Sequence, residues 1–277
     1  MIVGVGCAPT APADVPAPTA SEWPVVNSLS SGPLSVEVAP ETGGRIAGFS
    51  YEGQQVLRTE RDSANLQWGS TVWLSPQEAW GWPPHPTFDQ AAYDITRPDS
   101  NVLEMTSAVD PATQLQLTKR LRLEPEALYL TFQLHNRGDT VRQYGLWSNT
   151  RLPYEGGIVY VPGAQSRVTG MRDPVVKGQG MAVVRFDGRN AETGKIFTEL
   201  ADGNVRYLIG DLQFLQQTPY RTNDQVAPGQ SPLEVYLAPD EDFAEFELQG
   251  PYGAILPGGV PLTFELVWAI APLPGIN

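Results

Sequence analysis

Residues 113–134, TQLQLTKRLRLEPEALYLTFQL, contain two runs in which apolar and polar residues alternate. The apolar positions are Leu115, Leu117, Leu121 and Leu123 in the first run and Leu128, Leu130, Phe132 and Leu134 in the second. Lys119 interrupts the apolar face of the first run. A period of two residues is typical of a β-strand that buries one face. The stretch therefore predicts two strands that each pack one side against a second sheet.

The same pattern extends along the chain in both directions. The segment RIAGFSY runs into a Glu52-Gly53 turn, which predicts a hairpin, and apolar residues alternate again between residues 262 and 270. We expect Asp187-Gly188 and Asp202-Gly203 to separate further strands. No segment shows a 3.6-residue apolar period with helix caps. Many short strands with frequent turns indicate an all-β fold of two large, packed antiparallel sheets.

Composition limits the class of partner. The chain has 277 residues and a formal net charge of -13, from 31 acidic and 18 basic residues. Such a chain lacks the basic face that binds nucleic acid, and it has no electrostatic attraction to an anionic membrane. We expect a single β-sandwich domain over residues 23–277, preceded by a disordered tether at residues 1–22.

Cys7 is the single cysteine, which excludes a disulfide framework and a cysteine zinc site. It follows Gly6 in MIVGVGC, which resembles the end of a bacterial lipoprotein signal. The next residues, 8–21, form a tether rich in proline, alanine and threonine. We therefore expect lipidation at Cys7 and a location in the bacterial cell envelope, as a periplasmic or surface lipoprotein. A disordered tail without a lipid is the alternative.

Residues 68–89, WGSTVWLSPQEAWGWPPHPTFD, hold four of the seven tryptophans, four prolines and His85. Each proline lacks an N–H and biases the residue before it toward extended backbone, so residues 75–89 predict a stiff loop. Such a loop can plug one end of the sandwich, or it can present aromatic rings on which a sugar stacks. The residues alone leave both interpretations open.

Three stretches resemble the galactose mutarotase-like superfamily. Residues 43–57, GGRIAGFSYEGQQVL, are similar to its opening hairpin, and residues 69–77, GSTVWLSPQ, to the stretch that follows. Residues 243–268, FAEFELQGPYGAILPGGVPLTFELVW, resemble its glutamate-bearing strand, Leu-Pro-Gly turn and last strand. The strings Ser-Pro-Gln and Trp-Gly-Trp-Pro-Pro at 75–84 are similar to an uncharacterised bacterial lipoprotein-type domain family of that superfamily. The resemblance implies a β-supersandwich with a sugar-sized groove on a concave sheet.

The superfamily's mutarotases move protons at the anomeric centre of a sugar, with histidines and a glutamate as acid and base. The resemblance implies Glu245 or Glu247 as the base, because both precede the Leu-Pro-Gly turn on one strand face, and His85 as one histidine. Ser148 or Asn149 occupies the place of the second histidine. We therefore expect little mutarotase activity from this chain, with sugar binding retained.

The predicted ligand contacts are Trp73, Gln77, Trp80, Trp82, Asn149 and Arg151. They describe a carbohydrate-binding envelope lipoprotein whose partner is a mono- or oligosaccharide, without a cofactor or a metal. One alternative is a sugar-active enzyme, either an aldose 1-epimerase-like isomerase or a lyase or hydrolase on the same scaffold. The other is a structural envelope protein in which the aromatic loop is only a plug. The sequence leaves the sugar and the oligomeric state open.

Overall fold

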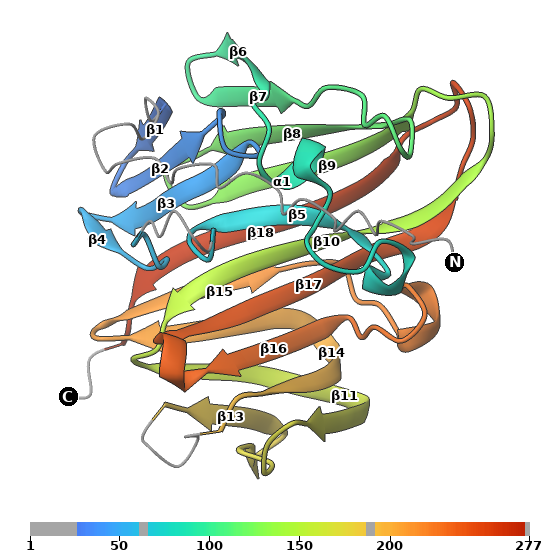
Figure 1. Ribbon diagram of the computed structural model, residues 1–277. Coiled ribbons are helices and arrows are strands. Elements are labelled where there is room, and N and C mark those ends of the chain that lie inside the picture. Colours follow the sequence, from blue (N-terminus) through green and yellow to red (C-terminus); the bar gives the residue numbers. More distant parts are fainter. Residues whose placement is uncertain (1–26, 61–65, 187–191, 275–277) are drawn as a thin grey trace, which may run out of the picture.

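The computed structural model describes residues 27–60, 66–186 and 192–274, which form two antiparallel sheets packed face to face (Figure 1). The first sheet contains β1 (Asn27–Ser31), β2 (Leu34–Ala39), β3 (Arg45–Tyr51), β4 (Gln54–Gln55), β5 (Ser70–Ser75), β10 (Arg142–Pro153), β17 (Phe243–Ile255) and β16 (Leu233–Ala238). The second contains β6 (Asp94–Asp99), β7 (Val102–Thr106), β8 (Leu115–Leu123), β9 (Leu128–Asn136), β18 (Leu262–Pro272), β15 (Leu212–Gln217), β13 (Met181–Arg185) and β12 (Val176–Gly178). The predicted all-β, two-sheet class is confirmed.

Two long strands, β11 (Gly157–Thr169) and β14 (Gly194–Ile209), belong to both sheets. The first half of β14 pairs with β16 in the first sheet, and its second half pairs with β15 in the second sheet. β11 follows β14 around the same corner. There the backbone of Gly163 approaches Glu199 so closely that a β-carbon would lie 2.1 Å from the Glu199 side chain, so the corner requires glycine.

The expected turn at Asp202-Gly203 is therefore wrong. These residues bend one continuous strand from the first sheet into the second, and Gly203 adopts φ +71 there. A sequence motif that ends a strand in a hairpin also bends a strand at a sheet corner, since both need a backbone with positive φ. Asp187-Gly188 lies outside the described residues.

The alternating apolar faces meet between the two sheets. Every apolar position predicted within residues 113–134 is buried in β8 or β9. From the last strand, the Trp268 ring packs 5.2 Å from the ring of Phe214 and 5.8 Å from that of Phe49. These contacts join β18 and β15 of the second sheet to β3 of the first. Full burial of a large apolar side chain contributes about 1.5–3 kcal/mol, so the paired faces hold the sandwich together.

Lys119 lies on the apolar face of β8 and is only 2% exposed. Its ammonium crosses the core and donates to the carbonyls of Gly43 and Gly44, at 2.6 and 3.1 Å, on the turn before β3. The ammonium also lies 4.9 Å from the centre of the Tyr93 ring. Burial lowers the pKa of Lys119 to about 7, and the nearby Arg45 cation adds to this effect. Lys119, the residue that interrupts the alternation, thus links the two sheets through hydrogen bonds.

Helical structure in the described ranges is limited to short turns. α1 (Pro86–Asp89) is one turn long and begins at a proline, whose missing N–H is not needed at the first helical position. η2 (Gln77–Ala79), η3 (Asn223–Gln225) and η4 (Pro239–Glu241) are 3₁₀ turns. The predicted loop at 75–89 therefore contains η2 and α1. Of the helices the structure describes, none has the length and apolar character to cross a membrane.

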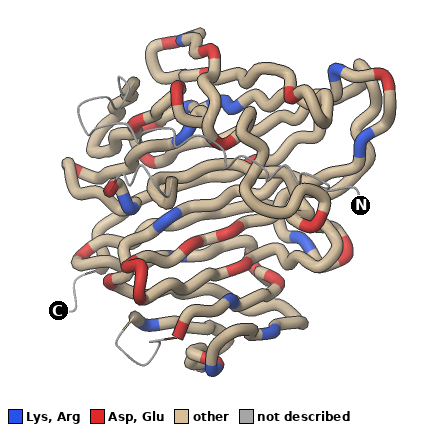
Figure 2. The backbone as a smooth tube through the Cα atoms, in the orientation of Figure 1, with Lys and Arg blue, Asp and Glu red and all other residues tan. Residues whose placement is uncertain are grey.

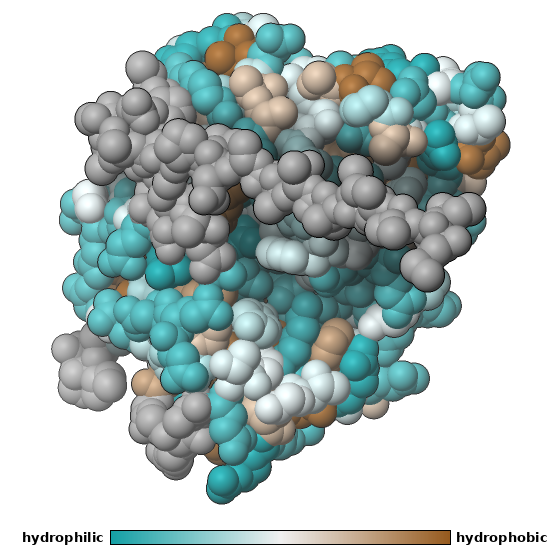
Figure 3. Space-filling view, viewed as in Figure 1, coloured by the Kyte–Doolittle hydropathy of each residue, from teal (hydrophilic) through white to brown (hydrophobic). Residues whose placement is uncertain are grey.

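The first sheet turns one face to the core and the other, which we call the polar face, away from it. Across β5, β10, β17, β16 and the first half of β14, register brings the same side of each strand into line. The polar face comprises Thr71, Trp73, Trp147, Asn149, Arg151, Lys195, Phe197, Glu234, Tyr236, Glu245, Glu247 and Gln249. Figure 2 shows acidic and basic positions side by side on these middle strands, and Figure 3 shows a mostly hydrophilic surface on this side.

Candidate functional site

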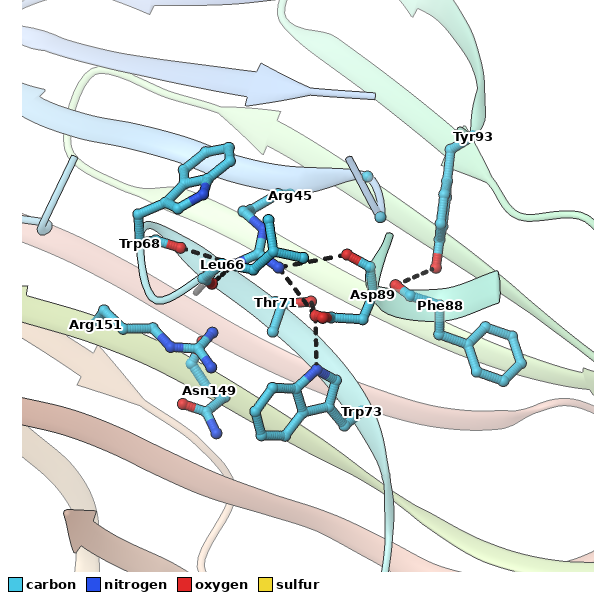
Figure 4. Close-up of polar contacts among 12 residues, drawn as sticks. Arg45, Leu66, Trp68, Thr71, Trp73, Phe88, Asp89, Tyr93, Asn149 and Arg151 are labelled. Carbon is cyan, nitrogen blue, oxygen red and sulfur yellow. Dashed lines mark hydrogen bonds and ion pairs between the residues drawn. The ribbon is translucent and has the colours of Figure 1, made fainter. Parts of the chain in front are cut away.

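The buried ion pair between Arg45 and Asp89 marks the upper edge of the polar face (Figure 4). Arg45 Nη2 lies 2.9 Å from Asp89 Oδ1, and Arg45 Nη1 donates to the carbonyls of Leu66 and Trp68 at 2.5 and 2.9 Å. Burial lowers the pKa of Arg45 to about 10, and the Asp89 carboxylate offsets part of this effect. The pair joins the start of β3 to the end of the tryptophan-rich loop.

Asp89 Oδ1 also accepts hydrogen bonds from two polar-face residues of β5. Trp73 Nε1 donates at 2.8 Å and Thr71 Oγ1 at 3.3 Å. The loop can reach this position because Gly43, at φ +67, leaves room for it: a β-carbon there would lie 2.3 Å from the Asp89 carbonyl oxygen. The carboxylate thus fixes the orientation of the Trp73 ring.

Trp73 is the centre of an aromatic cluster. Its ring lies edge to face with those of Trp80, Trp82 and Trp147, at centroid distances of 6.2, 5.9 and 5.3 Å. Trp73 is only 6% exposed, whereas Trp82 is 66% exposed. The structure therefore brings the three predicted tryptophans of the loop together, with Trp73 as a buried support and Trp82 as the ring open to solvent.

The loop between these rings is held by backbone contacts. Trp80 is half-buried, and its Nε1 donates to the carbonyl of Leu74 at 3.0 Å. The peptide bonds Ser75-Pro76 and Trp82-Pro83 are cis. Gln77, a predicted ligand contact, starts η2 and is partly exposed beside the cluster. The hydrogen bond to Leu74 thus holds the Trp80 ring against β5.

Arg151 and Glu245 form a second buried ion pair beneath the cluster. Arg151 Nε donates to Glu245 Oε1 at 2.7 Å, and the guanidinium lies 4.9 Å from the centre of the Trp73 ring. Arg151 was predicted as a ligand contact and Glu245 as a base. In the structure each is the other's partner, so neither is a solvated strand residue.

Lys195, on β14, holds two carboxylates of neighbouring strands. Its Nζ lies 2.6 Å from Glu247 Oε2 and 2.7 Å from Glu234 Oε2. The same ammonium lies 5.0 Å from the centre of the Trp147 ring and 5.4 Å from that of Phe197. Two rings and two carboxylates thus surround one ammonium, and Glu247 itself is only 1% exposed.

The protonation of Glu247 and Lys195 follows from the charges around them. Burial raises the pKa of Glu247 to about 8; the Lys195 ammonium opposes this rise, while Glu234 and Glu245 add to it. Burial alone lowers the pKa of Lys195, but Glu247 and Glu234 together outweigh it and leave the value raised. Both directions follow from two carboxylates that share one ammonium: the ammonium stays charged, while the second negative charge is disfavoured. The raised pKa of Glu247 therefore favours a protonated carboxyl group beside a charged Lys195.

Asn149 lies between these groups on β10. Its register partners are Thr71 on β5 and Glu247 on β17, so its side chain is on the polar face, whereas Ser148, opposite Val72, points into the core. Asn149 is 1% exposed, and within the described chain neither its amide nitrogen nor its amide oxygen has a hydrogen-bond partner. Of the two residues considered for the place of a histidine, only Asn149 reaches the site.

His85 is turned toward another part of the molecule. Its Nδ1 lies 3.8 Å from Asp110 Oδ2, and its ring packs 6.2 Å from the ring of Trp80. In the part of the chain that the structure describes, no hydrogen bond or ion pair joins His85 to Glu245 or Glu247. The structure thus brings both glutamates to the polar face without bringing the predicted histidine to them.

The site contains residues that the sequence reasoning missed: Arg45, Asp89, Lys195 and Glu234. The sequence contained a signal for Lys195 and Glu234, because the predicted strands KIFTEL and LEVYLA each carry a charged residue within an otherwise alternating pattern. For Arg45 the signal was a charged residue directly after two glycines at the start of an apolar strand. Their pairing needed the order of strands in the sheet, which the sequence did not contain.

Every cation on this face has a carboxylate partner. The three cations are Arg45, Arg151 and Lys195, and the four carboxylates are Asp89, Glu234, Glu245 and Glu247. With Glu247 protonated, the charges of this set cancel. The arrangement can offer hydrogen bonds and aromatic surface, but none of these three cations is free to receive an anionic ligand.

The two sheets, the strands they share and the glutamate-bearing β17 define a galactose mutarotase-like β-supersandwich. The structure is similar to galactose mutarotase-like proteins from Lactobacillus casei ATCC 334 (TM-score 0.59, 11% identity, 89% of this chain and 100% of that chain) and Clostridium acetobutylicum (TM-score 0.62, 9% identity, 89% and 95%). It is also similar to a galactose 1-epimerase from Lactobacillus acidophilus NCFM (TM-score 0.53, 14% identity, 88% and 93%). At such identities the likeness establishes the fold.

Within this class, residues 26–271 match the family model described as a domain of unknown function, DUF4380, and the chain belongs to this family. No curated protein matches the chain. The prediction of an uncharacterised family that resembles the galactose mutarotase-like superfamily is confirmed.

Proposed function

We propose that the chain binds uncharged saccharides on the polar face, next to the Trp82 ring. The observation that carries the proposal is the Asn149 amide, which is buried and makes no hydrogen bond within the described chain. A buried polar group left without a partner costs about 1–3 kcal/mol, so a site that keeps one has a use for it. A sugar hydroxyl both donates and accepts, which matches an amide that offers both.

The aromatic cluster and the charge balance support the same class of ligand. Trp82 offers an exposed ring for the apolar face of a sugar, and Trp73 holds it in place from behind. Because the arginines and the lysine of the site are already paired, a phosphate or a carboxylate finds no free cation there. We therefore propose neutral sugars rather than sugar phosphates or uronates.

The two alternatives have less support. A plug needs buried rings, and Trp82 is 66% exposed. A mutarotase needs an acid and a base at the same sugar ring. Burial raises the pKa of Glu247, which suits it to one of these roles, but His85 contacts Asp110 instead of the glutamates.

Titration calorimetry with galactose, glucose and their neutral oligomers tests the proposal, with sugar phosphates and uronates as anionic counterparts. We expect Asn149→Leu, similar in size but unable to hydrogen-bond, and Trp82→Ala each to weaken binding by about tenfold or more, equivalent to about 1.4 kcal/mol. Tyr129→Ala, which removes a partly exposed ring on the other sheet, is the matched control and should change nothing. Absence of binding to every neutral sugar, or tighter binding of the anionic ones, contradicts the proposal.

The place of the protein in the cell is a separate proposal. Cys7 lies outside the described residues, and we propose that it carries the lipid that anchors the domain to the bacterial cell envelope. A lipid would supply the membrane affinity that the acidic domain lacks. In cells that produce the chain with its complete signal, we expect it in the membrane fraction and Cys7→Ser in the soluble fraction. Equal partitioning of the two forms removes the anchor.

A further inference from the structure

The polar face continues past Arg151 into a cavity of about 360 Å³, which we call the distal pocket. It lies where β10 ends and β17 begins, and its lining includes Gln55, Arg58, Thr59, Pro153, Tyr154 and Asp242. Most of these side chains are polar and at least partly exposed. The pocket is therefore a polar cavity at the protein surface rather than a gap in the core.

Arg58 connects the distal pocket to the polar face. Its backbone N–H donates to the carbonyl of Arg151 at 3.0 Å, so the two arginines stand side by side at the edge of β10. The Arg58 guanidinium lies 5.2 Å from the centre of the Phe243 ring, and Phe243 precedes Glu245 by two residues on the same side of β17. The distal pocket thus adjoins the end of the polar face, next to the ion pair of Arg151 and Glu245.

The Arg58 side chain is held in place without using all of its donors. Nη1 donates to the carbonyl of Gln67 at 3.0 Å, and the Phe243 ring supports the guanidinium. Nε is buried and makes no hydrogen bond within the described chain; it lies 3.5 Å from a carboxylate oxygen of Glu60, whose side chain is largely exposed. Because Glu60 is its ion-pair partner, Arg58 offers the cavity no free cation, which suits a neutral, oxygen-rich ligand.

The length of the surface decides the size of the ligand. Trp147, beside the aromatic cluster, and Pro153, at the distal pocket, are six residues apart on β10, which corresponds to about 20 Å of extended strand. That span is several times the width of a single sugar ring. A monosaccharide could occupy one end of the surface but not both.

We infer that the site binds a linear, neutral oligosaccharide, with one end against Trp82 and a further sugar unit in the distal pocket. This inference rests on the proposed function and adds the length and direction of the ligand. Units bound at two places along one rigid surface add their contacts, so affinity should rise with the number of sugar units until the pocket is filled. Beyond that length it should be constant.

The test is a calorimetric series of one to six sugar units, made with β-1,4-linked glucose, α-1,4-linked glucose and β-1,4-linked N-acetylglucosamine. For at least one series we expect affinity to rise by tenfold or more, equivalent to about 1.4 kcal/mol, between the monosaccharide and the tetrasaccharide. Thr59→Trp fills the pocket from an exposed position and should abolish this gain. Thr96→Trp, at an exposed position on β6, is the control.

A second variant probes the pocket without filling it. Asp242 adopts φ +57, which glycine takes up without strain, so Asp242→Gly removes a lining carboxylate and keeps the backbone. We expect a reduced gain with length. An affinity independent of length, or a length gain that survives in Thr59→Trp, overturns the inference and leaves the proposed function standing. Failure of every sugar at every length overturns both.

Discussion

Replacing Asp89 with alanine is expected to lower the free energy of unfolding by about 3–5 kcal/mol, because it leaves the Arg45 guanidinium buried without a counter-charge. The same change removes the acceptor for Trp73 Nε1 and Thr71 Oγ1. Asp89→Asn keeps an acceptor of the same shape and should recover part of the loss. Urea unfolding followed by tryptophan fluorescence and by far-ultraviolet circular dichroism measures both variants.

A double-mutant cycle measures the coupling between Arg45 and Asp89 separately from the other contacts of these residues. Arg45→Met alone should also be strongly destabilising, since it leaves the Asp89 carboxylate without its cation. The double variant should be far more stable than the sum of the two single losses predicts, because neither buried charge remains. The exposed pair Arg120 and Glu104 is the control, with an expected coupling below about 1 kcal/mol. Additive losses at Arg45 and Asp89 would show that the pair is not coupled.

Replacing Lys195 with methionine is expected to destabilise the protein by an amount that depends on pH. The change leaves Glu234 and Glu247, both buried, without the one ammonium that they share. At pH 8 and above the unfolded chain ionises these carboxyl groups freely, whereas the folded variant has no ammonium beside them, so we expect a loss of about 3–5 kcal/mol. Near pH 5 the raised pKa of Glu247 lets this carboxyl group keep its proton in the folded state, and the loss should be smaller.

The sign follows from proton uptake. In the wild type the pKa of Glu247 is raised to about 8, above its ordinary value of 4.5, so the folded state holds a proton that the unfolded state releases between these values. Stability from this group is therefore complete below pH 4.5 and is lost as the pH rises through 8. Without Lys195 the pKa of Glu247 moves higher still, so the decline of stability continues to higher pH. Urea midpoints of Lys195→Met at pH 5, 7 and 9, compared with those of the exposed control Lys177→Met, measure how the loss of stability depends on pH. A loss that is equal at all three pH values contradicts the sharing of one ammonium by Glu234 and Glu247.

The sequence predicted the strands better than their partners. Alternation placed β8 and β9 correctly because the period of two belongs to a single strand and needs no information about neighbours. Lys119 shows the limit: its position on the apolar face was visible, but its acceptors lie on the Gly43-Gly44 turn of the other sheet. A contact between distant segments depends on the order of strands, which alternation does not encode.

The sequence likewise predicted some residues of the site and missed others. The segment from Trp147 to Arg151 did not separate Asn149 from Ser148, because Ser148 and Thr150 on the core side are polar as well; the register with β5 separates them. The joining of Trp73, Trp80 and Trp82 followed from their closeness in the chain. By contrast, Lys195 on β14 reaches Glu234 on β16 and Glu247 on β17, and Glu247 lies 52 residues further along the chain. The same limit applies to His85, whose direction depends on how the loop closes over Asp110.

The strand β14 runs through both layers, with Lys195 at its beginning and the partners of β15 toward its end. A sandwich of two separate sheets has a seam along which the layers can slide or part. Here β11 and β14 cross that seam, so neither layer can shift without pulling on hydrogen bonds of the other. The second sheet takes no part in the site. Through β14 it nevertheless helps to hold Lys195 in line with its carboxylates.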